Sequence, residues 1–199
     1  TELEAWATEA GHGFLAFDYS GHGLSDGAFE DGTISAWRED ALAAIDAHST
    51  GPIVLVGSSM GGWMALLTAL ARPDRVAGLV LIAPAPDFTE KLMWPEFSAE
   101  AQSEIMEQGF TQRPSDYDEP YTITRALIED GQTWQILDAP IKLDIPVRIL
   151  QGMQDADVPW KHAERLVDTI TSEDLIVEED MVVTLSHLGY IKRNPVTLY

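Results

Sequence analysis

Apolar and polar residues follow one another along the chain in blocks that predict strands and helices in turn. The predicted strands are short runs rich in apolar residues, at 14–19, 53–56, 76–83, 145–150 and 176–185. The predicted helices repeat apolar residues every three or four positions, at 1–10, 33–48, 60–71 and 160–170. Such alternation is typical of a parallel sheet covered on both faces. The sequence therefore predicts an α/β protein with a mostly parallel sheet.

The stretch from residue 84 to residue 140 interrupts this alternation. Helical spacing is found at 99–108 and 123–137, and no strong strand pattern is present. We expect a helical lid inserted between two core parts, 1–83 and 141–199. Large apolar side chains from the lid would either line a pocket beneath it or, for most of them, form the lid's own core. These side chains are Leu92, Met93, Trp94, Phe97, Ile105, Met106, Phe110 and Trp134.

The most informative stretch is the one that joins the second predicted strand to the helix after it. Residues 57–61 read Gly-Ser-Ser-Met-Gly, the G-x-S-x-G pattern, in the strand-turn-helix context that the nucleophile elbow of a hydrolase requires. Ser59 would project from the turn as nucleophile, and the N–H of Met60 at the helix start would stabilise an oxyanion. Gly57 and Gly61 would permit close backbone contacts. The alternative is a glycine-rich turn with an idle serine.

A serine nucleophile needs a histidine base, and the base needs an acid that orients it. In this kind of fold the chain order is Ser, acid, His. Ser59, Asp155 and His187 satisfy that order, with separations of 96 and 32 residues. Asp155 follows a predicted parallel strand, at the edge where such sheets bind ligands. Asp157 is the rival acid. The Gly-x-x-Asp-x-x-Val-Pro spacing favours Asp155 over it.

The remaining histidines are interpreted as structural. His12 and His22 lie beside or within glycine-containing loops, and His162 is expected on the surface of a helix. The five histidines show no paired ligand spacing such as H-E-x-x-H, so we expect neither a metal nor a cofactor.

Composition narrows the range of partners. The 199 residues include 33 acidic and 12 basic ones, a net charge of −21, which argues against nucleic acid or an anionic membrane. Cysteine is absent, so disulfides and thiolate chemistry are excluded. No apolar run approaches the roughly 20 residues that span a bilayer. We expect one domain, located in the cytoplasm, that acts on a small-molecule ester or acyl thioester.

Several segments together resemble the serine α/β-hydrolases, and more closely the branch of the palmitoyl-protein thioesterase that is also a mycophenolic acid acyl-glucuronide esterase. The matching segments are residues 17–23, 57–63, 71–73, 152–155 and 158–160. The resemblance implies an α/β-hydrolase fold with a lid, and a cofactor-independent reaction through an acyl-enzyme. Carried over by position, it assigns Ser59 as nucleophile and Asp155 as the acid, whereas His187 rests on chain order.

The resemblance also predicts what the chain as given would lack. The family has earlier strands and a glycine-rich oxyanion loop ahead of the helix matched by residues 1–10. We therefore expect residues 1–199 alone to be unstable and nearly inactive, with activity recovered when upstream sequence is added. The competing hypothesis is a non-catalytic chain of the same fold that acts as a binding scaffold.

Overall fold

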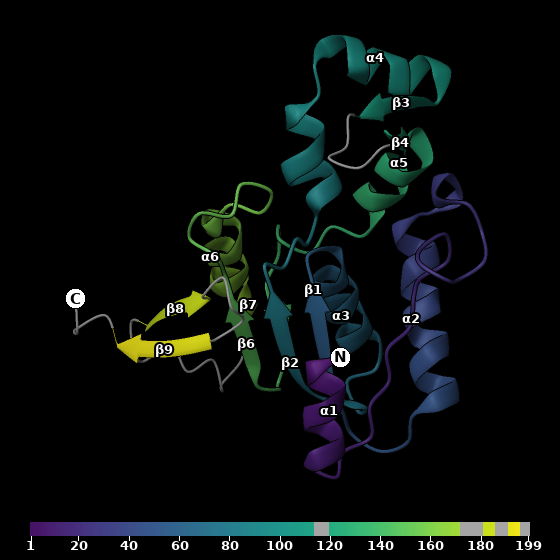
Figure 1. Ribbon diagram of the computed structural model, residues 1–199. Coiled ribbons are helices and arrows are strands. Elements are labelled where there is room, and N and C mark those ends of the chain that lie inside the picture. The colour runs from purple at the N-terminus through teal and green to yellow at the C-terminus, as the bar shows by residue number, and fades with distance from the viewer. Residues whose placement is uncertain (114–119, 172–180, 186–190, 196–199) are drawn as a thin grey trace.

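A three-stranded parallel sheet forms the centre of the molecule. The computed structural model describes residues 1–113, 120–171, 181–185 and 191–195. Strands β1 (Ile53–Ser58), β2 (Val76–Ile82) and β6 (Val147–Leu150) lie in the order β1-β2-β6, as Figure 1 shows. Pairing is parallel throughout, with Val56 opposite Val80 and Leu81 opposite Ile149. The predicted parallel sheet is therefore confirmed.

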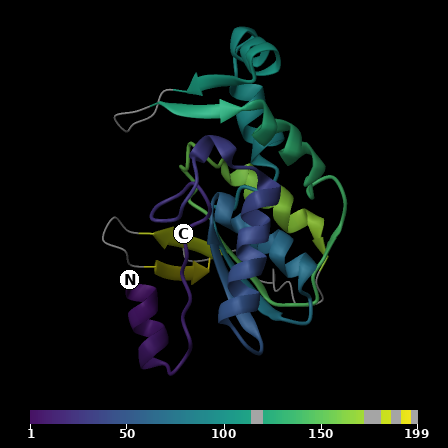
Figure 2. The same ribbon diagram turned by 90° about the vertical axis from the view of Figure 1, so that its right-hand side faces the viewer.

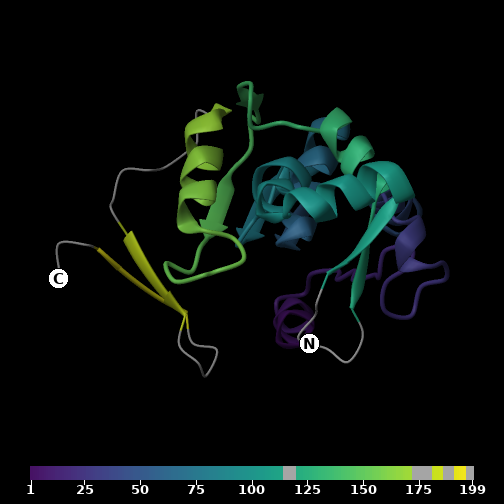
Figure 3. The ribbon, with the colours of Figure 1, turned by 90° about the horizontal axis from the view of Figure 1, so that it is seen from above.

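Helices α3 (Met60–Ala71) and α6 (Trp160–Thr169) cover one face of this sheet. Helix α1 (Glu2–Glu9) lies on the opposite side, which the view from above makes clear (Figure 3). The covered face holds the largest group of buried apolar side chains, contributed by both helices and all three strands. Burial of that many apolar side chains is the main stabilising term of the fold. The turn at Ser59 therefore joins two elements that contribute to this core, β1 and α3.

Helix α2 (Ile34–His48) packs beside α3 and extends the core sideways. Its first turn is capped by Thr33, whose hydroxyl accepts a hydrogen bond from Ala36 N at 3.1 Å. The apolar stripe of α2 includes Ile34 and Trp37, which pack with Trp63 of α3. The helix predicted at residues 33–48 is thus confirmed.

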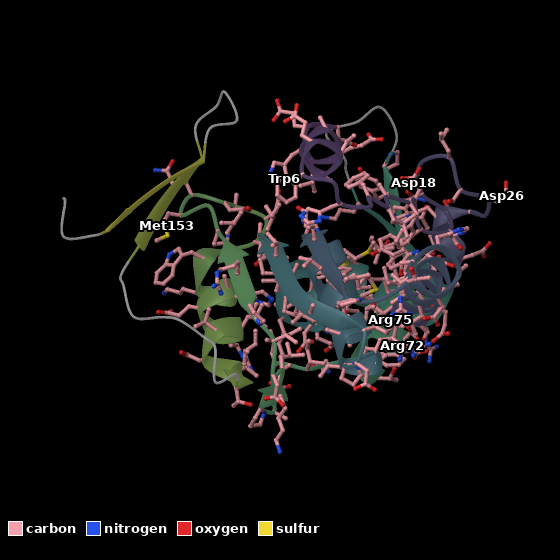
Figure 4. All side chains as sticks on the ribbon, turned by 90° about the horizontal axis from the view of Figure 1, so that it is seen from below. Trp6, Asp18, Asp26, Arg72, Arg75 and Met153 are labelled. Carbon is pink, nitrogen blue, oxygen red and sulfur yellow. The ribbon has the colours of Figure 1, made fainter. Side chains whose placement is uncertain are left out.

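A polar contact fixes the end of α3 against α2. Arg72 donates to the Asp46 carboxylate at 2.8 Å, and Arg75 donates to the Ser49 carbonyl at 3.1 Å. Figure 4 shows the two arginines next to each other below the sheet. These two hydrogen bonds tie the turn between α3 and β2 to the C-terminal end of α2.

The expected strand at residues 14–19 is not formed. These residues are extended but pair with no described strand, and Phe14, Leu15 and Phe17 are each about 40% exposed. The segment is held by α2 instead, because Ser20 N donates to Asp40 and Trp37 Nε1 donates to Ser20 O. An apolar run becomes a strand only where a neighbouring strand accepts its hydrogen bonds. That condition is not met at residues 14–19.

Strand β1 is consequently an edge strand in the described part of the chain. Its side chains alternate between the covered face and the opposite one, where Val54 is 60% exposed and Val56 is 46% exposed. Apolar exposure of this kind is unusual at a free sheet edge, which natural proteins normally protect with charge or a covering element.

Four of the remaining strands form two small sheets of two strands each. β5 (Ile141–Lys142) pairs in parallel with β7 (Ile170–Thr171). β8 (Met181–Leu185) pairs antiparallel with β9 (Ile191–Pro195), so the expected last strand joins a hairpin and not the central sheet. Figure 1 shows this hairpin beside the body, away from β1.

Residues 89–113 and 120–133 form a separate layer at the upper end of the sheet in Figure 1. The π-helical turn η2 (Thr89–Met93) and the short 3₁₀ helix η3 (Trp94–Glu96) lead into α4 (Ala99–Gln108). A hairpin of β3 (Phe110–Arg113) and β4 (Tyr121–Thr124) follows, and then α5 (Arg125–Thr133). Helix α4 agrees with the sequence pattern. The hairpin was not expected, since its strands are only four residues long; Figure 2 shows its two strands side by side at the upper left.

A partly buried hydrogen-bond network fastens α5 to α2. The carboxylate of Asp130 accepts from Ser35 N at 2.7 Å and from Ser35 Oγ at 2.6 Å. Trp134 Nε1 donates to the same hydroxyl at 2.7 Å, and the Arg38 guanidinium lies 4.7 Å from the Trp134 ring centre. The upper layer is therefore attached to the body by a charge-assisted contact as well as by apolar packing.

Replacing Asp130 with alanine is expected to lower the free energy of unfolding by about 1–3 kcal/mol, because Ser35 N–H would lose a charged acceptor in a partly buried place. Denaturant unfolding measures the change. Glu129→Ala is the matched control, since Glu129 makes only an exposed pair with Arg125, and we expect a change below about 0.5 kcal/mol. Equal losses for the two variants would contradict the assignment of Asp130 as an anchor.

Candidate active site

Ser59 occupies the sharp turn between β1 and α3. Its backbone has φ 51° and ψ −120°, a conformation that side-chain-bearing residues rarely adopt. Three hydrogen bonds hold the turn: Ser59 N donates to Ile82 O at 3.0 Å, and Ser59 O accepts from Gly62 N at 2.9 Å and Ala85 N at 3.1 Å. Strain that the surroundings maintain in this way is typical of functional positions.

Close packing on both sides of the turn explains two of its glycines. A Cβ on Gly57 would overlap the carbonyl of Gly61, and a Cβ on Gly62 would come within 2.9 Å of the Pro84 side chain. Gly57 is therefore required, as the sequence predicted. The prediction was wrong for Gly61, where a Cβ would meet nothing within 4 Å, and Gly62 takes its place at the close approach.

A pocket of about 440 Å³ opens at Ser59. Its apolar lining comes from Met60, Ala85, Phe88 and Val158 and, from the upper layer, Leu92 and Met93. Lys91, Glu96, Arg113 and Asp157 add charged groups to the lining, and none of them was singled out for the pocket from the sequence. The wall of this pocket therefore combines apolar side chains with charged ones, and such polar groups fix the orientation of a ligand in small-molecule sites.

Most of the other large apolar residues expected around the pocket are placed elsewhere. Trp94 and Phe97 pack on the buried cluster of Ile105, Ile123 and Ile128 inside the upper layer. Trp134 packs toward α2 and α3. Met106 and Phe110 are exposed. We expected most of these side chains to form a core of the upper layer. That holds for Trp94, Phe97 and Ile105. It does not hold for Trp134, Met106 or Phe110.

The helix start supplies a backbone donor beside the serine. Met60 is the first residue of α3, so its N–H belongs to the first turn, where no intrahelical acceptor is available. Met60 also lines the pocket together with Ser59. An N–H in that place can stabilise negative charge that develops on a substrate oxygen.

The loop after β6 presents two aspartates with different surroundings. Asp155 is half-buried, and its Oδ1 accepts from Asp157 N at 3.0 Å and from Val158 N at 2.9 Å. Its Oδ2 makes no hydrogen bond within the described residues. Asp157 is exposed and lines the pocket. Asp155 thus has one oxygen committed to its own loop and one available to a further donor.

The structure describes four of the five histidines. His187, the expected base, lies outside the described residues. His22 packs edge-on against Phe29 and Trp37, with ring centres 5.4 and 5.1 Å away, an arrangement that orders its loop. His12 lies beside Trp6 on α1, with ring centres 5.8 Å apart.

His162 differs from its expected surface position. It is 7% exposed, and its Nε2 lies 2.7 Å from the carbonyl oxygen of Pro86, to which it donates. Burial lowers the pKa of His162, as do the charges of Arg165 and Lys91, while the Pro86 carbonyl and Asp87 oppose the shift. Local sequence does not reveal this burial, because α6 turns its His162 side toward the 83–88 segment, a contact between residues 76 positions apart.

The depressed pKa of His162 predicts a pH dependence of stability. In the unfolded chain a histidine takes up a proton near pH 6.5, whereas the buried His162 takes it up only at lower pH. The contribution of His162 to the free energy of unfolding is therefore full above pH 6.5 and is lost as the pH falls. We expect His162→Gln to show a smaller drop in the free energy of unfolding between pH 7.5 and pH 5.5 than the unchanged protein. Denaturant unfolding at both pH values measures it, and identical drops would contradict the prediction.

The described ranges contain neither a metal site nor a helix that could span a membrane. There, no group of three or more His, Asp or Glu side chains is arranged to hold a metal ion. Nor is any described helix long and apolar enough to cross a bilayer.

Comparisons with known proteins agree with this architecture. Residues 2–195 match the alpha/beta hydrolase family. The human protein "Palmitoyl-protein thioesterase ABHD10, mitochondrial" is 37% identical over 177 residues, which are 88% of this chain and 58% of that protein. This chain therefore spans less than two thirds of the length of that relative.

Two solved structures are similar in fold as well as in sequence. A putative hydrolase from Agrobacterium vitis S4 has a TM-score of 0.83 and 46% identity, over 87% of this chain and 69% of that one. Alpha/beta hydrolase domain-containing protein 10 from mouse has a TM-score of 0.76 and 38% identity, over 86% and 69%. The strained serine turn, the parallel sheet beneath it and these similarities lead to one conclusion: the chain belongs to the alpha/beta hydrolase family.

Proposed function

We propose that this chain carries the active site of a serine hydrolase that cleaves carboxylic esters and acyl thioesters. The observation that carries the proposal is Ser59, which is held at φ 51° and lines a pocket with both apolar and charged side chains in its wall. Backbone strain of this size persists only where the surrounding contacts over-determine it. The human relative's name, a palmitoyl-protein thioesterase, supports the choice of acyl chemistry.

The proposed reaction has two halves. Ser59 Oγ attacks the acyl carbon while His187 takes the hydroxyl proton, and the oxyanion that forms is held by the N–H of Met60. The tetrahedral adduct collapses, the C–O or C–S bond breaks, and His187 returns the proton to the leaving alcohol or thiol. Water then attacks the acyl-enzyme in the same manner and releases the acid. Asp155 would orient and stabilise the charged imidazole through its uncommitted Oδ2.

The layer formed by residues 84–140 is proposed to act as a lid between the core parts 1–83 and 141–199. It contributes Leu92 and Met93 to the pocket and so offers apolar surface to an acyl chain. A net charge of −21 would repel polyanionic substrates from the same entrance. The cytoplasmic location remains a proposal as well; the human relative is named as mitochondrial.

A fluorophosphonate probe tests the proposal directly, because it labels only an activated serine. We expect the protein to be labelled and the label to map to Ser59 by peptide mass spectrometry. Ser58→Ala should leave labelling in place. If the alternative of a non-catalytic scaffold is correct, Ser59 will not react with the probe at concentrations that saturate a known serine esterase.

A further inference from the structure

The segment from Ala83 to Phe88 runs along the pocket wall next to Ser59. Ala83 N donates to Leu150 O at 2.8 Å and Ala85 N donates to Ser59 O at 3.1 Å. Phe88 and the buried Ala85 line the pocket, and the two residues between them are buried as well. The segment therefore connects the serine turn to the apolar surface that a substrate would touch.

Few backbone groups are available to hold this segment in place. Pro84 and Pro86 have no N–H, and Ala83 and Asp87 adopt φ values of 43° and 57°, outside regular structure. The Asp87 side chain is fully buried and accepts from Ile136 N at 2.8 Å and Leu137 N at 2.9 Å, which fixes one end. Across the described residues, the Pro86 carbonyl has His162 Nε2 as its single hydrogen-bond partner.

His162 links this segment to the opposite wall of the pocket. It lies on α6, which begins directly after Val158 and Pro159, and both of those residues line the pocket. A carbonyl oxygen can only accept, so His162 Nε2 carries the hydrogen in the 2.7 Å contact with Pro86. One buried hydrogen bond thus sets the separation of the two walls.

We propose that His162 is a positioning residue that determines acyl-chain selectivity, through its hold on Pro86 and hence on the wall formed by Ala85 and Phe88. The proposal rests on the proposed hydrolase function and assigns a role to a residue outside the Ser, acid and His positions. A short acyl group that stays near Ser59 would not contact the wall formed by Ala85 and Phe88, whereas a long one would pack against it.

The test compares p-nitrophenyl acetate with p-nitrophenyl octanoate in the full-length protein. For His162→Leu we expect KM for octanoate to rise about 3- to 10-fold, the equivalent of one lost hydrogen bond, with less than about 2-fold change for acetate. His162→Gln should restore the octanoate KM to within about 2-fold, because its amide N can take the place of Nε2. His162→Asn, whose amide is too short to reach Pro86, should behave like His162→Leu and serves if that variant fails to fold.

Leu166→Ala is the matched control, a buried change on the same helix with no polar contact. It should lower stability without altering the ratio of the two KM values. A proportional loss on both esters in His162→Leu and His162→Asn would reduce the role of His162 to general stability and overturn the proposal, as would an unchanged octanoate KM. Failure of the proposed function looks different: the unchanged protein would hydrolyse neither ester, and Ser59 would not react with a fluorophosphonate.

Discussion

Ser59→Ala is expected to lower kcat for ester hydrolysis by about 10⁴- to 10⁶-fold, the range found when a serine nucleophile is removed from other hydrolases. The hydroxyl is the atom that forms the acyl-enzyme, so no neighbouring group can take its part. Stability should change little, because Ser59 is exposed and the hydrogen bonds that hold its turn come from its backbone N and O. Initial rates with p-nitrophenyl butyrate measure the loss.

Ser58→Ala is the control for this variant. Ser58 is the last residue of β1 and is exposed like its neighbour, yet it does not line the pocket. We expect its kcat to remain within about 3-fold of that of the unchanged protein. Residual activity in Ser59→Ala above about 1% would show that a different nucleophile operates, and the proposed mechanism would then have to be abandoned.

The parts of the fold that were predicted from sequence are those with strong local patterns. Helix α2 has both an apolar stripe and a Thr33 cap, and β1 runs straight into a turn whose glycines leave little choice of structure. Such segments combine local preference with burial, so pattern and structure agree. The position of Ser59 follows from the same combination.

The parts that were not predicted depend on contacts between distant residues. Residues 14–19 have the composition of a strand, but strand formation needs a partner that local sequence does not reveal. The β3–β4 hairpin has only four pairs and no strong alternation. His162 was placed on a surface because its own helix is polar around it, while the Pro86 carbonyl that satisfies it lies on the other side of the pocket.

The choice between the two candidate acids rests partly on residue spacing and partly on their structural surroundings. Spacing after β6 favours Asp155 over Asp157, and the structure adds a physical distinction between them. Asp155 is half-buried and braces its loop through Oδ1, which leaves Oδ2 in a fixed orientation. Asp157 has no such support and projects from the exposed part of the loop into the pocket lining. A residue that must orient a histidine needs the fixed position.

Asp155→Asn is therefore expected to lower kcat by about 10³- to 10⁴-fold, with KM changed far less. The amide oxygen can still accept from Asp157 N and Val158 N, so the loop should keep its form. The amide nitrogen that replaces Oδ2 cannot accept the histidine N–H, so the imidazole would lose both its orientation and the stabilisation of its charged form. Asp157→Asn, the matched control in the same loop, should cost less than about 10-fold. Steady-state kinetics of both variants separate the two aspartates, and a larger loss in Asp157→Asn would move the role of acid from Asp155 to Asp157.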